Sequence, residues 1–208
     1  MIQDLSLKNW VVGNSQKILH RIHDDDVNIA ILNRNTQSFF EEIKLVLDEA
    51  IDIHINGSSS LIIKTIEQKL SKYHYINKDI ISILLHFKEV TKATNFKLVL
   101  SCVTTNMCTK FHTDVNTIRL LCTYSGPGTL WLTEDNINRN ALKAKEHNHC
   151  IVINKTNIQQ VKTGAVVLLK GDKYSKEAQG VVHKSPYIVE KNTKRLLLRI
   201  DTNEFLNF

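Results

Sequence analysis

The chain has 208 residues, of which 42% are hydrophobic and 23% are charged, close to the averages of soluble globular proteins. These values exclude disordered, collagen-like and coiled-coil proteins, and the length suits one domain that buries a core of its own. Lysine and arginine number 27 against 21 acidic residues, a net charge of +6 that favours anionic ligands in general. The basic residues form only loose clusters, around residues 143–145, 170–176 and 191–195. They are not interleaved with aromatic residues on one face, so nucleic acid is not expected as a partner.

Residues 1–10 lack the basic and then apolar segments of a signal peptide. No apolar run approaches the roughly 20 residues that are needed to cross a bilayer. We therefore expect a cytoplasmic protein with no membrane partner, and the sequence does not indicate its oligomeric state.

The first half of the chain predicts one strand followed by helices. Residues 27–32 form a short apolar run that is typical of a strand. From residue 35 to about residue 94 the apolar residues recur at helical spacing, which predicts about three amphipathic helices. Residues 57–60, Gly-Ser-Ser-Ser, can cap the second helix, and Asn77 or Asp79 can cap the third.

The second half consists of short β-rich runs separated by turn residues such as those of Ser125-Gly-Pro-Gly128. The predicted strands are 96–103, 117–124, 128–132, 150–153, 165–169, 180–183 and 195–200. Many short strands of this kind indicate a sandwich or barrel, of which the jelly roll is the commonest cupped form. The predicted fold is α+β, with a helical N-terminal portion (residues 1–95) packed on a C-terminal double-stranded β-helix, or jelly roll (residues 96–208), in one compact unit.

A metal site is indicated by His112 and Asp114, which are two residues apart at the start of the β-rich half. In an extended segment such side chains leave the same face about 7 Å apart and can bind one ion. His183, at the end of a later apolar run, can supply the third ligand. Two imidazoles and one carboxylate form the facial triad of Fe(II) oxygenases. A second His-x-Asp, His23 to Asp25, lies in a polar stretch that is typical of a solvated loop.

Three arginines can bind a carboxylate near this site. Arg195 and Arg199 share one face of the predicted last strand, so one guanidinium can point into the cup. Arg119 is a single charge inside an apolar strand, and a buried charge there needs an anion from either the chain or a ligand.

The cysteines leave a second metal hypothesis open. None of the four belongs to a Cys-x-x-Cys pair, and a chain of this length does not need disulfides, so we predict reduced thiols. His147, His149 and Cys150 together with another cysteine could nevertheless bind Zn²⁺. The other cysteines are Cys102, Cys108 and Cys122. The alternative is a polar loop that leads into a strand whose cysteine is a small buried apolar residue.

Five segments, in a specific order along the chain, form a recognisable pattern. They are Cys108–Asp114, Arg119–Thr129 with Trp131 and Leu132, Gly164–Gly171, Val182–Pro186, and Arg195–Asp201. Together they resemble a bacterial family known only as domain of unknown function 1826. The resemblance covers about residues 95–202, and the first half matches only loosely, through residues 28–34.

That family in turn looks like the Fe(II)/2-oxoglutarate oxygenases of the double-stranded β-helix fold. The resemblance implies that His112, Asp114 and His183 hold Fe(II). It also implies that Arg195 or Arg199 binds the far carboxylate of 2-oxoglutarate, although in those oxygenases the basic residue usually follows the distal histidine more closely.

Two functional hypotheses follow. The first is an oxygenase that hydroxylates an unidentified small-molecule or protein substrate. The alternative is a non-catalytic, cupin-like metal-binding protein, a zinc or iron sensor or chaperone that uses the same pocket.

Overall fold

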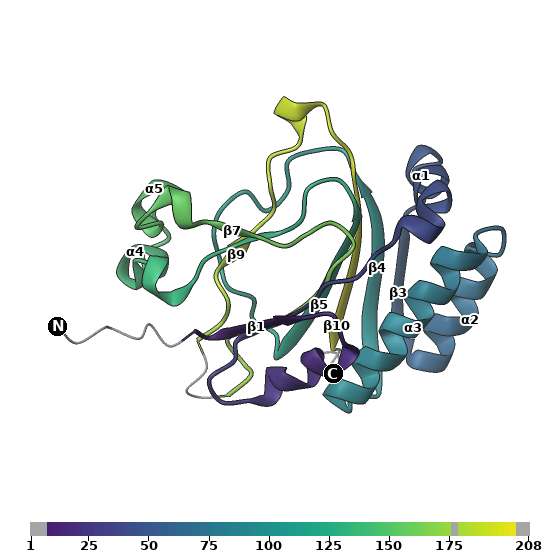
Figure 1. Cartoon of the computed structure of the whole chain (residues 1–208), viewed down its shortest axis with the longest axis horizontal. Helices are drawn as coiled ribbons and strands as arrows, with labels where there is room; N and C mark the ends of the chain where they lie inside the picture. Colours follow the sequence, from purple (N-terminus) through teal and green to yellow (C-terminus); the bar gives the residue numbers. More distant parts are fainter. Residues whose placement is uncertain (1–7, 176–178, 203–208) are drawn as a thin grey trace.

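The computed structural model describes residues 8–175 and 179–202, in which a large sheet lies between a layer of helices and a smaller sheet (Figure 1). The large sheet has seven strands and the small sheet has three. In spatial order the large sheet contains β1 (Trp10–Gly13), β2 (Ile29–Leu32), β8 (Val166–Lys170), β5 (Ile118–Ser125), β10 (Arg195–Thr202), β4 (Asn95–Val103) and β3 (Ile53–Ser58). The small sheet contains β7 (Gln159–Gln160), β6 (Leu130–Trp131) and β9 (His183–Lys184). Neighbouring strands are antiparallel except for the parallel pair β1 and β2.

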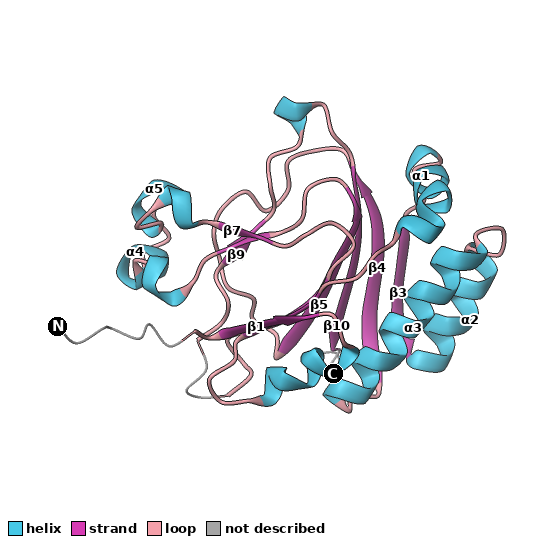
Figure 2. Cartoon of the chain, in the orientation of Figure 1, coloured by secondary structure: helices cyan, strands magenta, loops and turns pink. Residues whose placement is uncertain are grey.

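The helices form two separate groups (Figure 2). One group covers the outer face of the large sheet and consists of η1 (Gln16–His23), α1 (Phe40–Asp48), α2 (Ser59–Lys69) and α3 (His74–Thr91). The other group, α4 (Arg139–Lys143) and α5 (Asn148–Ile151), lies between β6 and β7 in the chain. Short 3-10 turns complete the secondary structure: η2 (Gln37–Phe39), η3 (Glu134–Asn136), η4 (Lys155–Asn157) and η5 (Val189–Lys191). Within the described residues, none of the helices is both long and apolar enough to cross a membrane.

Strand periodicity divides the large sheet into two faces. Leu196, Leu198 and Ile200 of β10 pack into the core shared with the helices. Because side chains alternate along a strand, Arg195 and Arg199 lie on the opposite, inner face, as predicted. There the sheet packs against Trp131 and other apolar residues of the small sheet and its flanking segments. The inner face therefore receives both the core contacts of the small sheet and the candidate site.

The sequence predicted the three helices and β2 correctly but placed several element ends wrongly. The predicted strand 150–153 is wrong, because residues 148–151 form α5, where the side chain of Asn148 bonds the backbone of Thr109 and Phe111. The predicted strands 128–132 and 180–183 are replaced by the two-residue strands β6 and β9, and strands β1, β3 and β7 were not predicted. Consequently, three of the seven strands of the large sheet precede residue 95.

Local sequence patterns predicted the N-terminal cap of α2 correctly but not that of α3. Ser58 caps α2 as predicted, because its side chain accepts a hydrogen bond from the Leu61 amide. The predicted caps of the third helix are wrong, since α3 begins at His74. The carboxylate of Glu42 in α1 accepts hydrogen bonds from the amides of Tyr75 and Ile76, at 2.8 and 2.9 Å. An acceptor from another helix thus satisfies the N-terminus of α3.

Asp79 instead takes part in a network that ties α3 to the large sheet. The guanidinium of Arg34 donates to both of its carboxylate oxygens, and the hydroxyl of Tyr124 donates to Oδ2 at 2.6 Å. Burial, together with the charge of Asp79, raises the pKa of Tyr124 well above its usual value, so the phenol remains a donor. The Arg34 and Asp79 side chains are only 19% and 16% exposed.

We expect Asp79→Ala to lower the free energy of unfolding by about 3 kcal/mol, because it leaves the Arg34 guanidinium without its anion in a largely buried position. Urea denaturation of the wild type and the variant measures the change. Glu49→Ala is the matched control, since it breaks an ion pair with Lys72 on the exposed surface and should leave stability nearly unchanged. Equal stability of the two variants would contradict a stabilising role for the Arg34 network.

Candidate metal centre

His112 and His183 face one another across an isolated antiparallel bridge. The His112 amide donates to the His183 carbonyl at 3.1 Å, and the His183 amide donates to the His112 carbonyl at 2.9 Å. Asp114 follows two residues after His112, so its side chain leaves the same side of the extended segment. The structure thereby brings the three predicted residues together, with one ligand atom from each lying within 4.8 Å of the others.

Two carbonyl groups set the orientation of the imidazoles. Nδ1 of His112 lies 2.9 Å from the Lys110 carbonyl, and Nδ1 of His183 lies 2.9 Å from the Val181 carbonyl. A carbonyl only accepts, so each Nδ1 must carry the proton, and the lone pair of a neutral ring is then on Nε2. The Nε2 atoms lie 3.9 Å (His112) and 3.5 Å (His183) from the Asp114 carboxylate oxygens. These separations exceed hydrogen-bond length but suit atoms that share one cation.

Burying these side chains without a cation is energetically unfavourable. Asp114 is 8% exposed and His183 is 5% exposed, and burial lowers the pKa of His183, which favours its neutral form. Oδ2 of Asp114 is buried and has no hydrogen-bond partner among the described residues. A carboxylate with one unpartnered oxygen, lying beside two Nε2 lone pairs, fits a divalent cation, which would accept electrons from all three side chains.

The backbone around Asp114 is held by the segment that follows β8. The Asp172 amide donates to the Asp114 carbonyl at 2.8 Å. At Gly171 a side chain would place its Cβ only 2.1 Å from the Asn116 carbonyl oxygen, so this close approach of the two segments requires glycine.

Arg119 on β5 neutralises the carboxylates at the base of the site. It forms ion pairs with Oδ1 of Asp114 and, at 2.6 Å, with Oδ1 of Asp201. Of the two origins considered for its anion, the structure shows carboxylates of the chain itself. Oδ1 of Asp114 is thus bound by Arg119, while Oδ2, the oxygen nearest His183, is left for a cation.

The other two candidate arginines differ in their partners. Arg195 is 1% exposed, and among the described residues its guanidinium hydrogen-bonds only the hydroxyls of Thr123, at 3.1 Å, and Ser185, at 3.4 Å. Burial lowers its pKa to about 10, and no carboxylate pairs with it in the described part of the chain. Arg199, with a side chain that is 34% exposed, lies 3.2 Å from Asp201. Both arginines line a cavity of about 80 Å³ together with His112 and His183.

The structure does not assemble the alternative sites. Both ring nitrogens of His23 are used, with Nδ1 at 3.0 Å from the Tyr174 hydroxyl and Nε2 at 2.9 Å from the Val90 carbonyl. The rings of His147 and His149 stack, but within residues 8–175 and 179–202 these histidines do not belong to any group of three closely placed potential ligands. The four cysteines are free thiols.

A second group of potential ligands, which was not predicted from the sequence, consists of His20, His86 and Glu89. Two of them are three residues apart on α3, a spacing that places side chains on one helix face and could have identified the pair. The third comes from η1, so only the tertiary structure completes the group.

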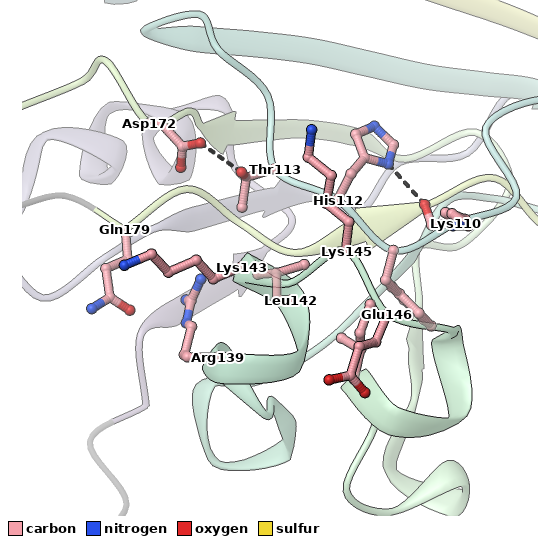
Figure 3. Close-up of a pocket in the computed structure, with 12 residues that line it drawn as sticks. Lys110, His112, Thr113, Arg139, Leu142, Lys143, Lys145, Glu146, Asp172 and Gln179 are labelled. Carbon is pink, nitrogen blue, oxygen red and sulfur yellow. Dashed lines mark hydrogen bonds between the residues drawn. The ribbon is translucent and has the colours of Figure 1, made fainter.

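A larger cavity of about 700 Å³ adjoins the candidate site and includes His112 and Thr113 in its wall (Figure 3). Its other residues come mainly from α4, α5 and the loop between them. They include several basic side chains: Lys110, Arg139, Lys143 and Lys145. The sequence signal for this cavity was the loose basic cluster at residues 143–145.

The model of a family described as a protein of unknown function (DUF1826) matches residues 13–201. A search of curated proteins found no match. The described fold is similar to several solved structures at low sequence identity, which supports the fold alone.

Three of these solved structures have a TM-score of 0.50. The dioxygenase for auxin oxidation 1 from Arabidopsis thaliana, in a complex with 2-oxoglutarate, is 8% identical, and the match covers 94% of this chain and 92% of that one. A prolyl-4-hydroxylase from Pseudomonas putida is 7% identical over 90% and 93% of the two chains. The Fe(II)/α-ketoglutarate-dependent dioxygenase TqaL is 12% identical over 89% and 84%. The mixed α and β architecture with one large sheet is therefore shared with Fe(II)/2-oxoglutarate oxygenases.

We expect Arg119→Leu to reduce the free energy of unfolding of the metal-free protein by about 3–5 kcal/mol, because the Asp114 and Asp201 carboxylates lose their common cation. Saturating divalent cation should restore part of the loss by binding at Asp114. Thermal and urea unfolding measure both effects. Arg139→Leu, which removes a surface pair with Glu134, should cost less than about 1 kcal/mol. A cost of Arg119→Leu no larger than that of this control would refute the pairing.

Proposed function

This chain belongs to the DUF1826 family of proteins of unknown function, and we propose that it is an Fe(II)/2-oxoglutarate-dependent oxygenase. The observation that carries the proposal is the group His112, Asp114 and His183, in which Asp114 and His183 are buried and the Asp114 carboxylate lies beside two imidazoles with one oxygen that lacks a hydrogen-bond partner among the described residues. The similarity of the fold to oxygenases of this class supports it. In this interpretation the two facing sheets form a double-stranded β-helix, and the helical N-terminal portion packs on its outer face.

The three side chains would hold Fe(II) through Nε2 of each histidine and one oxygen of Asp114. Ligands of this kind on one side of the ion leave adjacent positions open, and iron supplies the oxygen chemistry that side chains cannot perform. The chain's own contribution is orientation: the carbonyls of Lys110 and Val181 hold the rings, and Arg119 holds the carboxylate.

Arg195 is the residue that we assign to 2-oxoglutarate. Its guanidinium is buried in the same small cavity as the histidines, with hydroxyls but no carboxylate beside it in the described chain. A carboxylate of the co-substrate would provide the missing anion in a bidentate contact. Arg199 is a weaker candidate, because Asp201 already pairs with it. A buried cation that lacks an anion is not needed by a non-catalytic metal-binding protein, and this favours the oxygenase over that alternative.

The metal assignment predicts that protein purified without chelator holds about one divalent ion per chain. His112→Ala and His183→Ala should each lose most of it, since each removes one of three ligands. Elemental analysis and titration with Fe(II) under anaerobic conditions measure the loss. A double variant, His147→Ala with His149→Ala, is the control and should keep its metal. Full retention by both single variants would place the metal elsewhere.

The co-substrate assignment predicts opposite effects of Arg195→Met on stability and on binding. Removing a buried charge that has no partner should leave the melting temperature unchanged or raise it. Binding of 2-oxoglutarate should weaken at least about thirtyfold, roughly 2 kcal/mol, because the anion loses a charge-assisted contact. The weak visible charge-transfer band of the anaerobic protein with Fe(II) and 2-oxoglutarate reports the binding.

Arg199→Met is the matched control and should bind 2-oxoglutarate almost as well as the wild type. If the wild-type protein holds metal but shows no such band, the chain is instead a non-catalytic, cupin-like metal-binding protein, a zinc or iron sensor or chaperone. A larger effect of Arg199→Met than of Arg195→Met would exchange the roles of the two arginines.

A further inference from the structure

The cavity of about 700 Å³ beside His112 carries an excess of positive charge. Four basic and two acidic side chains line it: Lys110, Arg139, Lys143 and Lys145, with Glu146 and Asp172. Arg139 is paired with Glu134, which leaves the three lysines. In the part of the chain that the structure describes, these three have no ion pair or hydrogen bond through their amino groups.

The acidic side chains are held away from those lysines. Asp172 accepts hydrogen bonds from the Thr113 hydroxyl at 2.6 Å and from the Gly180 amide at 3.0 Å. Figure 3 shows the Glu146 carboxylate pointing away from the amino groups of Lys143 and Lys145. The lysines therefore remain available to a ligand.

Lys145 has a backbone conformation that normally favours glycine. It follows Ala144 at the end of α4 and has a φ of 56°, in the left-handed region where a side chain is strained. In the view of Figure 3 its side chain extends toward His112, and Lys143 extends toward Gln179. Lys92 at the end of α3 has the same conformation, so this φ alone does not indicate a function; at Lys145, however, the side chain adds a cation to the cavity wall.

The rest of the wall is largely apolar. Phe111, Leu142 and Ile151 line the cavity and belong to one cluster of packed side chains. Pockets of about 300–1,000 Å³ bind small organic molecules, and an apolar wall with a few charged groups selects a ligand with both characters.

We infer that this cavity binds a small organic anion with an apolar body, a carboxylate or a phosphate ester, as the substrate. That this anion is a substrate rests on the proposed function, whereas the binding of the anion to the cavity does not. His112 belongs both to this wall and to the small cavity with His183 and Arg195, so a ligand here would lie beside the metal centre.

A fluorine NMR titration of the metal-free protein tests the binding. The probes are 4-(trifluoromethyl)phenyl phosphate and 4-(trifluoromethyl)benzoate, with the neutral 4-(trifluoromethyl)benzyl alcohol for comparison. At least one anionic probe should bind about tenfold more tightly than the alcohol, because charge-assisted contacts to the lysines add to the apolar contacts. Equal binding of the alcohol and both anions would overturn the inference.

Lys145→Gly separates the role of the side chain from its structural effect. Glycine relieves the strain at a φ of 56°, so the melting temperature should stay equal or rise while binding of the anionic probe weakens about five- to tenfold. Lys143→Gln should weaken it similarly. Lys92→Gly is the matched control: this lysine also has a left-handed φ, 57°, at the end of α3, and its replacement should leave binding unchanged. An effect of Lys92→Gly as large as that of Lys145→Gly would overturn the inference.

Manganese(II) provides the test of location. When Mn²⁺ is bound at the triad, it should broaden the fluorine signal of the bound anion in the wild type but not in His183→Ala. Lysine-dependent binding without any Mn²⁺ binding would refute the proposed function and leave the anion site intact. Bound Mn²⁺ with lysine-dependent but unbroadened probe signal would overturn the substrate assignment.

Discussion

The pair of backbone hydrogen bonds between His112 and His183 is the contact on which the candidate site depends. It joins a loop that follows β4 to the short strand β9 and places two imidazoles side by side, with ring centroids 4.7 Å apart. Asp114 then enters the same space because two residues along an extended chain return to the same side. Without that bridge the three side chains would have no fixed relation.

Near the bridge, within the described chain, one buried anion lacks a cation on one oxygen, and one buried cation lacks an anion. Arg119 binds one oxygen of Asp114, and the other oxygen is buried without a partner among the described residues. Across the small cavity, Arg195 is a buried cation whose hydrogen-bond partners in the described part of the chain are two hydroxyls. Buried groups of this kind are unfavourable unless a ligand completes them. A divalent cation at Asp114 and a dicarboxylate that reaches Arg195 would satisfy both, which is why these two features together support an oxygenase more strongly than either alone.

The stability needed to hold such a site comes from the other face of the large sheet. The helices pack there on alternate residues of the same strands that carry Arg119 and Arg195. The Arg34 and Asp79 pair ties α3 to the large sheet. On the far side of the site, α4 and α5 add a basic and apolar wall. The large sheet thus has one face that packs against helices and an opposite face that carries buried polar groups without a full set of partners in the described chain.

The sequence by itself determined the features that depend on near neighbours in the chain. Helical periodicity located α1, α2 and α3, strand alternation put Arg195 and Arg199 on one face, and the two-residue spacing of His112 and Asp114 put their side chains together. These predictions succeeded because side-chain direction within one element follows from its backbone period.

Only the tertiary structure decided which partner each charged or polar group finds. Glu42 caps α3, and Asp79, expected as a cap, binds Arg34. Residues 148–151 form a helix because contacts with another segment outweigh local strand propensity. The same holds for Arg195, whose guanidinium meets hydroxyls from other segments, Thr123 and Ser185, and no carboxylate in the described chain. Such pairings join residues far apart in sequence, and local sequence patterns carry no information about their distance in space.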